Sequence, residues 1–198
     1  MTGEYIIETM GTLIDSAFEK VDRTAFMLDQ YRHLSGLDQP FPIGFGQTIS
    51  QPTTVRMMLG WLEARRGQKV LDVGAGSGWT SALLAHIVGR RGRVTAVERI
   101  VQLVEFGRAN CMRAGIDNVD FYRPRRGQLG WPLGAPYDRI LVSAAASSLP
   151  AKLIDQLAPG GVMVVPVKSD IVVVRRAHRG NDTTMQVHPG FTFVPLVS

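Results

Sequence analysis

The stretch that most constrains this chain is residues 69–78, KVLDVGAGSG, which is followed by Trp79 and an apolar run through Ala85. Apolar residues at its start suit a short buried strand, and the small residues after them suit a tight loop at the first turn of a helix. Glycines let the main chain adopt positive φ and let a ligand lie against it, while a helix N-terminus offers free N–H groups to a polar or anionic group. The sequence therefore predicts a cofactor-binding unit of strand, loop and helix.

The glycine spacing narrows the class of cofactor. A dinucleotide-binding loop has the pattern GxGxxG/A, in which the last small residue packs the helix on the strand. Here the third glycine, Gly78, falls one place early and the bulky Trp79 occupies the last position, which counts against NAD. Glu98 ends the next expected strand, RVTAVE, where its carboxylate can accept hydrogen bonds from both hydroxyls of a ribose. A glycine-rich turn without a ligand is the alternative for the loop alone.

Strands and helices alternate after residue 69. The expected strands are 69–73, 93–97, 119–122 and 138–143, and the expected helices are 79–88 and 101–114. Strands separated by helices pair in parallel through right-handed crossovers. The apolar stretches 162–167 and 171–176 predict an antiparallel pair, and the segment 191–197, FTFVPLV, could add a further strand. Together these patterns predict a doubly wound, mostly parallel, seven-stranded α/β sheet with helices on both faces.

The residues before this sheet read as an extension to it. Apolar residues between positions 6 and 21 recur at three- and four-residue steps, which predicts an amphipathic helix. Residues 22–40 are polar and irregular, and are expected to form short surface helices or a lid. The loop 40–52, PFPIGFGQTISQP, ends where Pro52 starts a helix, so Ser50 could be a plain N-cap. We expect one domain over residues 1–198, in which residues 1–52 form an N-terminal helical and substrate-loop extension.

Composition excludes several classes of protein. The single cysteine, Cys111, can form no internal disulfide and has no partner for a metal site, so we expect no metal and a reduced, cytoplasmic setting. No window approaches the ~20 apolar residues that span a bilayer, and the first twenty residues do not form a secretory signal. The net charge of +5 favours anionic partners. No basic stripe interleaved with aromatic residues accompanies that charge, so nucleic acid is not an expected partner.

Five segments together resemble one enzyme family. The pattern D-x-G-x-G-x-G is similar to motif I of AdoMet-dependent methyltransferases. The segments GFGQTISQP, VLDVGAGSGW, VERI, APYDRILVSAAA and FVPLV follow the order seen in protein-L-isoaspartate O-methyltransferases, over roughly residues 15–197. The resemblance implies a Rossmann-like class I methyltransferase fold and S-adenosyl-L-methionine (AdoMet) as cofactor. It also implies methylation of the α-carboxylate of isoaspartyl residues in damaged peptides and proteins. Separately, we expect the protein to be a monomer.

The same resemblance implies which residues form the site. Ser50 matches the hydroxyl that contacts the substrate carboxylate, and is the implied catalytic residue. The other implied substrate-binding residues are Ile43, Gly46, Gln47, Thr48 and Ile49. The implied cofactor-binding residues are Asp72, Gly74, Ala75, Gly76, Ser77, Gly78, Glu98, Arg99, Arg126 and Gly127. A carboxylate with a pKa near ~3.5 is already ionised at neutral pH, so the reaction needs alignment and exclusion of water, not a strong base.

Two departures from the family pattern stand out. The family usually carries Gly-Asp-Gly after the third strand, where the acid recognises the adenine amino group, but this chain has Arg125, Arg126 and Gly127. An arginine has donors only and cannot accept that hydrogen bond. Arg126 could stack on the adenine, an arginine could clamp a substrate carboxylate, or the loop could lie in solvent. Lys168 stands where a glycine often follows Pro-Val.

Two other functions are compatible with parts of the sequence. Residues 70–98 also resemble the cofactor region of tRNA adenine methyltransferases, and the chain is basic; GQTISQP and FVPLV argue against this alternative. A non-catalytic or regulatory protein that keeps the fold but has lost turnover through Arg125 and Arg126 is the second alternative. Labelled-methyl transfer to an isoaspartyl peptide or to tRNA, and calorimetry with AdoMet, would separate the three hypotheses.

Overall fold

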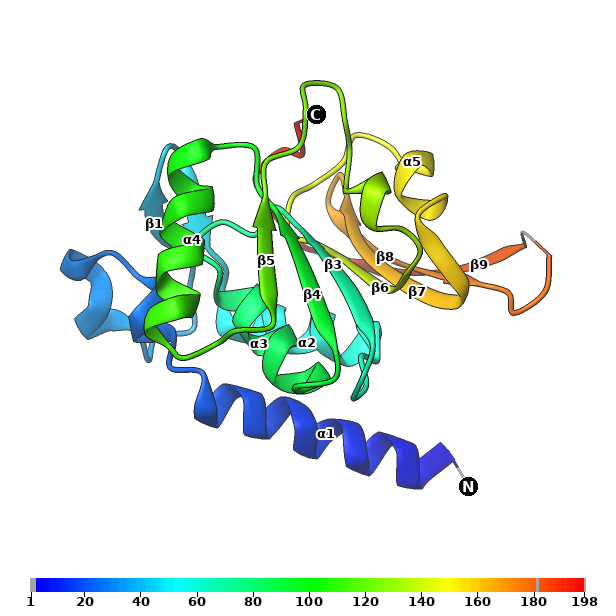
Figure 1. The fold of residues 1–198 in the computed structure, drawn as a ribbon, viewed down its shortest axis with the longest axis horizontal. Coiled ribbons are helices and arrows are strands. Elements are labelled where there is room, and N and C mark those ends of the chain that lie inside the picture. The colour runs from blue at the N-terminus through cyan, green and yellow to red at the C-terminus, as the bar shows by residue number, and fades with distance from the viewer. Residues whose placement is uncertain (1–2, 181, 198) are drawn as a thin grey trace.

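A seven-stranded sheet forms the centre of the molecule, shown in Figure 1. The computed structural model describes residues 3–180 and 182–197, with side chains from Gly11 onward. In spatial order the strands are β5 (Val119–Tyr122), β4 (Arg93–Val97), β3 (Lys69–Val73), β6 (Tyr137–Val142), β7 (Leu157–Val167), β8 (Asp170–Arg176) and β9 (Thr183–Pro189). The first five strands pair in parallel, whereas β8 and β9 are antiparallel to their neighbours. The predicted doubly wound, mostly parallel sheet is confirmed.

Helices cover the two faces of the sheet unequally. One face carries α2 (Pro52–Leu62), α3 (Trp79–Val88) and α4 (Val101–Arg113), and α1 (Gly3–Lys20) packs against α3 and α2. The other face is covered by the short helices η3 (Pro132–Gly134) and α5 (Ala151–Ile154) and by loop residues. Alternation along β3 explains the two cores, because Val70 faces the first set of helices and Leu71 faces the second.

The N-terminal region forms a separate layer beside the sheet. The 22–40 segment contains two short 3-10 helices, η1 (Arg23–Phe26) and η2 (Asp29–Leu34). This agrees with the expectation of short surface helices. A hairpin follows, made of β1 (Phe41–Gly44) and β2 (Gln47–Ile49), which the sequence analysis treated as a plain loop. In Figure 1 this hairpin lies next to α4, while α1 crosses the opposite, amino edge of the sheet. Among the described residues, none of the helices has the length and apolarity needed to span a bilayer.

The outermost strand of the sheet is formed by a segment that the sequence analysis did not identify as a strand. The sequence left open a further strand at residues 191–197, but this segment forms only an isolated bridge between Ala145 and Pro195. The seventh strand is β9, whose sequence TTMQVHP is too polar to stand out. It forms because β8 offers a free edge along its whole length, from Asp170 to Arg176, and main-chain hydrogen bonds do not depend on apolar side chains.

The turn between β7 and β8 contains one departure from the family pattern, Lys168, and shows why a glycine suits that position. The turn consists of Lys168 and Ser169, since Val167 pairs with Asp170. Lys168 has φ of 56°, the left-handed region that a residue with a Cβ adopts at a cost of roughly 1 kcal/mol. A glycine at this position would carry no such cost.

Candidate active site

Three connected hollows lie at the carboxyl edge of the parallel strands. The first, here called the Glu98 cavity, holds about 150 Å³ and is lined by Glu98, Arg99, Gln128 and residues 195–197, among others. The second, the glycine-loop cavity, shares Gln47, Gly74, Glu98 and Ala144 with the first. The third, the outer groove, holds about 280 Å³. Its lining residues are Pro40, Thr48, Ser50, Gln51, Thr54, Ser143, Thr192, Phe193 and Val194.

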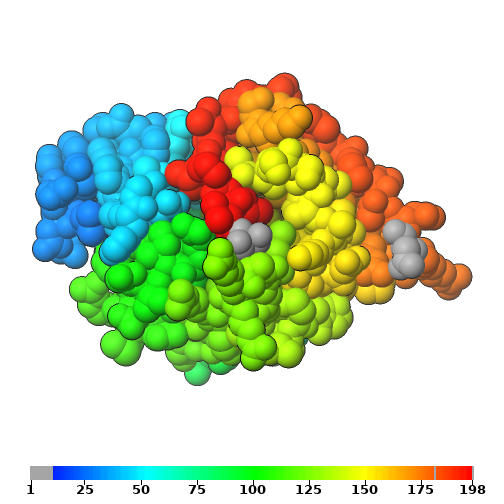
Figure 2. Space-filling model, turned by 90° about the horizontal axis from the view of Figure 1, so that it is seen from above, coloured from blue at the N-terminus to red at the C-terminus, as the bar shows by residue number. Residues whose placement is uncertain are grey.

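The last residues of the chain help to enclose these hollows. Figure 2 looks down on this edge and shows the C-terminal segment, in red, between the cyan residues near position 50 and the yellow residues near position 150. Main-chain hydrogen bonds tie the segment to the loop after β6: Ala145 N donates to Val194 O at 2.8 Å, and Leu196 N donates to Ala145 O at 2.8 Å. The FVPLV sequence therefore forms a wall of the site.

The glycine loop meets both the hairpin and α4. Gly76 has φ of 52° and lines the glycine-loop cavity, where a Cβ would approach Ile43 Cδ1 to 3.0 Å. Gly78 has φ of 88°, and a Cβ there would lie 2.9 Å from Gly107 O on α4. The positive φ and the close approach together explain why these positions need glycine. Gly74, Ala75, Gly76 and Ser77 line the cavity, whereas Gly78 packs behind the loop.

Glu98 lies beside the loop with its carboxylate fixed in place. Its side chain is buried, and it lines both the Glu98 cavity and the glycine-loop cavity. Oε2 accepts a hydrogen bond from Gly76 N at 3.1 Å, and Oε1 accepts one from Ile100 N at 3.0 Å. Each carboxylate oxygen has two lone pairs, so both can accept a further hydrogen bond from a ligand hydroxyl. This arrangement fits the two hydroxyls of a ribose.

Asp72 supports the loop from below and does not line the hollows. Its side chain is fully buried at the end of β3, where Oδ2 accepts a 2.6 Å hydrogen bond from Ser81 Oγ of α3. Oδ1 has no hydrogen-bond partner among the described residues. Burial raises the pKa of this carboxyl to about 7; the Ser81 hydrogen bond opposes the rise, and the charge of Glu98 adds to it.

Ser50 lies in the wall between the cofactor side and the open side. Together with Thr48, Ser143 and Val194 it lines both the glycine-loop cavity and the outer groove. The idea that Ser50 is a plain N-cap is wrong, because the N-cap of α2 is Gln51. The free Thr53 N–H of that helix donates instead to Asp38 Oδ1 at 2.8 Å. Ile43, Gln47 and Ile49 also line the glycine-loop cavity, while the exposed Gly46 does not.

A family model for protein-L-isoaspartate(D-aspartate) O-methyltransferases matches residues 7–198. The chain belongs to this family. It is 42% identical to the protein-L-isoaspartate O-methyltransferase of Methanothrix thermoacetophila, over 100% of this chain and 95% of that protein. It is 50% identical to that of Aeropyrum pernix, over 91% of this chain and 71% of that protein.

A solved structure shows the same fold. A crystal structure of a protein from Plasmodium falciparum, in complex with S-adenosyl-L-homocysteine, aligns with a TM-score of 0.79 and 23% identity over 99% of this chain and 98% of that one. Family membership makes the chain an AdoMet-dependent methyltransferase. It also favours the isoaspartate hypothesis over the tRNA adenine methyltransferase.

The loop that departs from the family pattern places its arginines outside the hollows. Arg126 and Gly127 are exposed and line neither the Glu98 cavity nor the glycine-loop cavity. The loop turns there, since Gln128 N donates to Arg125 O at 2.9 Å. Gln128, next along the chain, lines the Glu98 cavity instead. Four of the expected cofactor-binding residues therefore lie outside the hollows: Asp72 and Gly78 support the glycine loop from behind, and Arg126 and Gly127 face solvent.

Sequence reasoning missed three contributors to the site. Gln128 follows directly after the RRG that replaced the family's acid, so its position was a signal for it. Ser143 directly follows β6, within the APYDRILVSAAA segment, but no motif singled it out. Arg23 belongs to the polar 22–40 segment and is nevertheless buried. Among the described residues, no group of three or more His, Cys, Asp or Glu side chains could hold a metal ion.

Proposed function

We propose that this enzyme transfers the methyl group of AdoMet to the α-carboxylate of isoaspartyl residues in peptides and proteins, with Ser50 as the residue that holds that carboxylate. The observation that supports this role is the position of Ser50 between two hollows. One is lined by the glycine loop and Glu98, and the other is an open groove. A methyl donor and a carboxylate on the two sides of this wall would meet at the Ser50 hydroxyl.

The residues on the inner side fit AdoMet. Glu98 would accept the ribose hydroxyls, and the main chain of Gly74 and Gly76 leaves space beside it. When bound, AdoMet supplies a sulfonium-activated methyl group, so the protein needs to supply only position and a dry environment.

The outer side offers hydroxyls to a carboxylate that is already ionised. Ser50 and Ser143 both line the outer groove, and neither hydroxyl has a hydrogen-bond partner among the residues that the structure describes. Two hydroxyl donors can hold one carboxylate oxygen while the other faces the methyl group. None of the described residues that line the groove has a charged side chain. We therefore expect recognition of the isoaspartyl linkage with little preference for the charge of neighbouring residues.

Labelled-methyl transfer tests this function directly. The purified enzyme would be incubated with labelled AdoMet and a matched pair of peptides that differ only in an isoaspartyl or an ordinary aspartyl linkage. Base-labile label is expected in the isoaspartyl peptide alone. Label in unmodified tRNA, or in neither peptide despite heat of binding with S-adenosyl-L-homocysteine, would contradict the proposal. The second outcome would favour the non-catalytic alternative.

We further infer that residues 1–198 act as one domain, a cytoplasmic monomer in which residues 1–52 supply the substrate side. In support, Pro40, Thr48, Ser50 and Gln51 line the outer groove, whereas the loops after β3 and β4 line the Glu98 cavity and the glycine-loop cavity. The thiol of Cys111 is buried and its pKa is raised to about 12, chiefly by burial, so it is an inert thiol suited to a reducing compartment. Light scattering of the purified protein tests the monomer.

A further inference from the structure

A buried arginine contacts the main chain of Ser50. Arg23, in η1, is only 6% exposed. Its guanidinium lies 5.6 Å from the centre of the Phe41 ring and 5.2 Å from that of Trp79, which itself lines the glycine-loop cavity. Burial lowers the pKa of Arg23 to about 10, with the charge of Asp38 opposing that shift. A charge is expensive to bury, so its retention here calls for a reason.

The guanidinium joins two segments through four main-chain carbonyl groups. Nη1 donates to Ser35 O at 3.2 Å and to Leu37 O at 3.1 Å. Nη2 donates to Gln39 O at 2.8 Å and to Ser50 O at 2.9 Å. The planar fork of arginine can hold several acceptors in one fixed geometry, which the single ammonium of lysine cannot do. Three of the bonds order the turn 35–39, and the fourth reaches the main chain of Ser50.

The turn 35–39 also fixes the main chain next to Ser50, from the solvent side. Asp38 Oδ2 accepts a hydrogen bond from Gln51 Nε2 at 2.9 Å, and Oδ1 accepts one from Thr53 N at 2.8 Å. These hydrogen bonds lower the pKa of Asp38. Ser50 is therefore held from behind by Arg23 and, through its neighbours, by Asp38. Because both contacts involve this turn, it forms a fixed support for Ser50, which argues against its moving as a free lid.

We propose that Arg23 is a positioning residue for methyl transfer, which fixes the main chain at Ser50 so that its hydroxyl lies between the glycine-loop cavity and the outer groove. This proposal rests on the proposed function. A reaction without a strong base depends on alignment, and a misplacement of about 1 Å can lower the rate by about 100-fold. Arg23 touches neither the hollows nor any reacting atom, so its effect must pass through Ser50.

A double-mutant cycle tests the proposal. Arg23→Lys keeps the charge and the aliphatic stem but loses the fork. We expect it to lower kcat for an isoaspartyl peptide by roughly 10-fold or more, with the Kd of S-adenosyl-L-homocysteine changed by less than about 2-fold. In a Ser50→Ala background the same substitution should cause almost no further loss. Equal losses of kcat in both backgrounds, or a parallel loss of cofactor affinity, would overturn the assignment.

The chain offers a matched control and a second variant. Arg56 of α2 also lies over an aromatic ring, Phe18, and pairs with Asp15, but it lines none of the three hollows. Arg56→Lys should leave kcat unchanged. If Arg23→Lys does not fold, the surface variant Asp38→Ala takes its place. A loss of kcat that disappears in a Ser50→Ala background would support the fixed turn. An unchanged kcat would reject it.

Hydrogen exchange separates failure of this proposal from failure of the proposed function. The amides of Ile49, Ser50, Gln51 and Thr53 should exchange faster in Arg23→Lys than in the wild type, whatever the substrate. Unchanged exchange in these amides overturns the positioning role even if the wild type is active. Faster exchange in an enzyme that does not methylate isoaspartyl peptides would instead reject the function and, with it, the catalytic meaning of the contact.

Discussion

The main-chain nitrogen of Gly76 donates a 3.1 Å hydrogen bond to the Oε2 atom of Glu98. The acid expected to bind the ribose is therefore also a structural partner of the glycine loop. Its other oxygen accepts from Ile100 N, at the start of α4. One carboxylate thus joins the loops that follow two adjacent parallel strands, and it helps to set the shape of the glycine loop.

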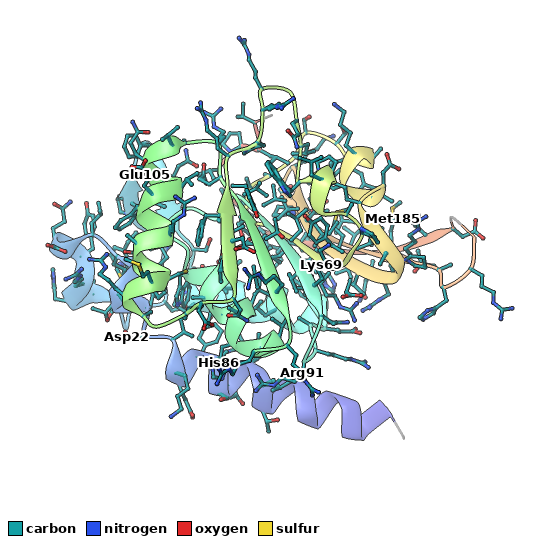
Figure 3. All side chains as sticks on the ribbon, viewed as in Figure 1. Asp22, Lys69, His86, Arg91, Glu105 and Met185 are labelled. Carbon is teal, nitrogen blue, oxygen red and sulfur yellow. The ribbon has the colours of Figure 1, made fainter. Side chains whose placement is uncertain are left out.

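Glu98→Gln should weaken cofactor binding. The amide keeps one acceptor oxygen but presents an NH2 group where the second carboxylate oxygen accepted, so a ribose hydroxyl or a main-chain N–H loses its partner. Hydrogen bonds to charged groups contribute about 1.5–3 kcal/mol, so we expect the Kd of S-adenosyl-L-homocysteine to rise by roughly 10- to 100-fold in calorimetry. Glu105→Gln on the outer surface of α4 (Figure 3) is the control and should bind normally.

Ser50→Ala should slow transfer without loosening the cofactor. Ser50 lines the groove side of the wall as well as the cavity side, and the proposed partner of its hydroxyl is the substrate. We expect kcat for an isoaspartyl peptide to fall by roughly 10-fold or more, as for the loss of one hydrogen bond to a charged group, with an unchanged Kd for AdoMet. Ser148→Ala, in an exposed loop, serves as control. Equal losses in binding and turnover would undo the role given to Ser50.

Gln128 should recognise the adenine edge in place of the family's acid. Two amide side chains, those of Gln47 and Gln128, line the Glu98 cavity, and Gln128 is the one that follows the loop where the family carries its acid. Its amide can accept from the adenine amino group and donate to a ring nitrogen. Gln128→Leu should raise the Kd of S-adenosyl-L-homocysteine by roughly 10-fold, while binding of the 6-oxo analogue S-inosyl-L-homocysteine changes less. Identical effects on both ligands would show that Gln128 does not contact the 6-position. Arg126→Ala should leave both affinities unchanged.

Asp72 makes stability depend on pH in the neutral range. Its folded pKa is raised to about 7 by burial, above an unfolded value of about 3.9. Between these values the folded protein keeps a proton that the unfolded chain has lost, so the free energy of unfolding falls as pH rises towards 7. The amide in Asp72→Asn does not titrate but can still accept a hydrogen bond from Ser81. In urea unfolding, the difference in the free energy of unfolding between Asp72→Asn and the wild type should shift in favour of the variant by on the order of 2 kcal/mol from pH 5 to pH 8. Parallel pH profiles would contradict this assignment.

Lys168→Gly should stabilise the protein. The substitution removes the left-handed strain at φ of 56° in the β7–β8 turn, where the lysine is exposed and its main-chain N–H still donates to Ala146 O. We expect a gain of roughly 1 kcal/mol in the free energy of unfolding, part of it offset by the greater freedom of glycine in the unfolded chain. Lys168→Ala, which keeps the Cβ, should gain nothing. A destabilised Lys168→Gly would mean that the turn is unstrained.

The outermost strand, β9, could not be predicted from the local sequence pattern. Figure 3 shows Met185 on β9, on the side of the sheet away from Glu105 of α4. Met185 is more than half exposed, so burial does not stabilise this strand; pairing with β8 does. A polar segment of this kind is recognised as a strand only once the strand that it pairs with, here β8, is known. The same reason explains why FVPLV, the more apolar segment, became a wall of the site and not a strand.

Local sequence determined the elements that burial and turn chemistry specify. The strand at 69–73, the glycine loop and the helix at 79–88 follow from apolar runs and positive φ, and Glu98 follows from the end of the next strand. Tertiary structure alone decided which distant groups meet. It turned Arg126 outward and Gln128 inward, placed Ser143 in the same groove as Ser50, and buried Arg23 behind the serine. Such contacts join segments far apart in the chain, as the hydrogen bond from Arg23 to Ser50 does across 27 positions, and no periodicity along the chain encodes them.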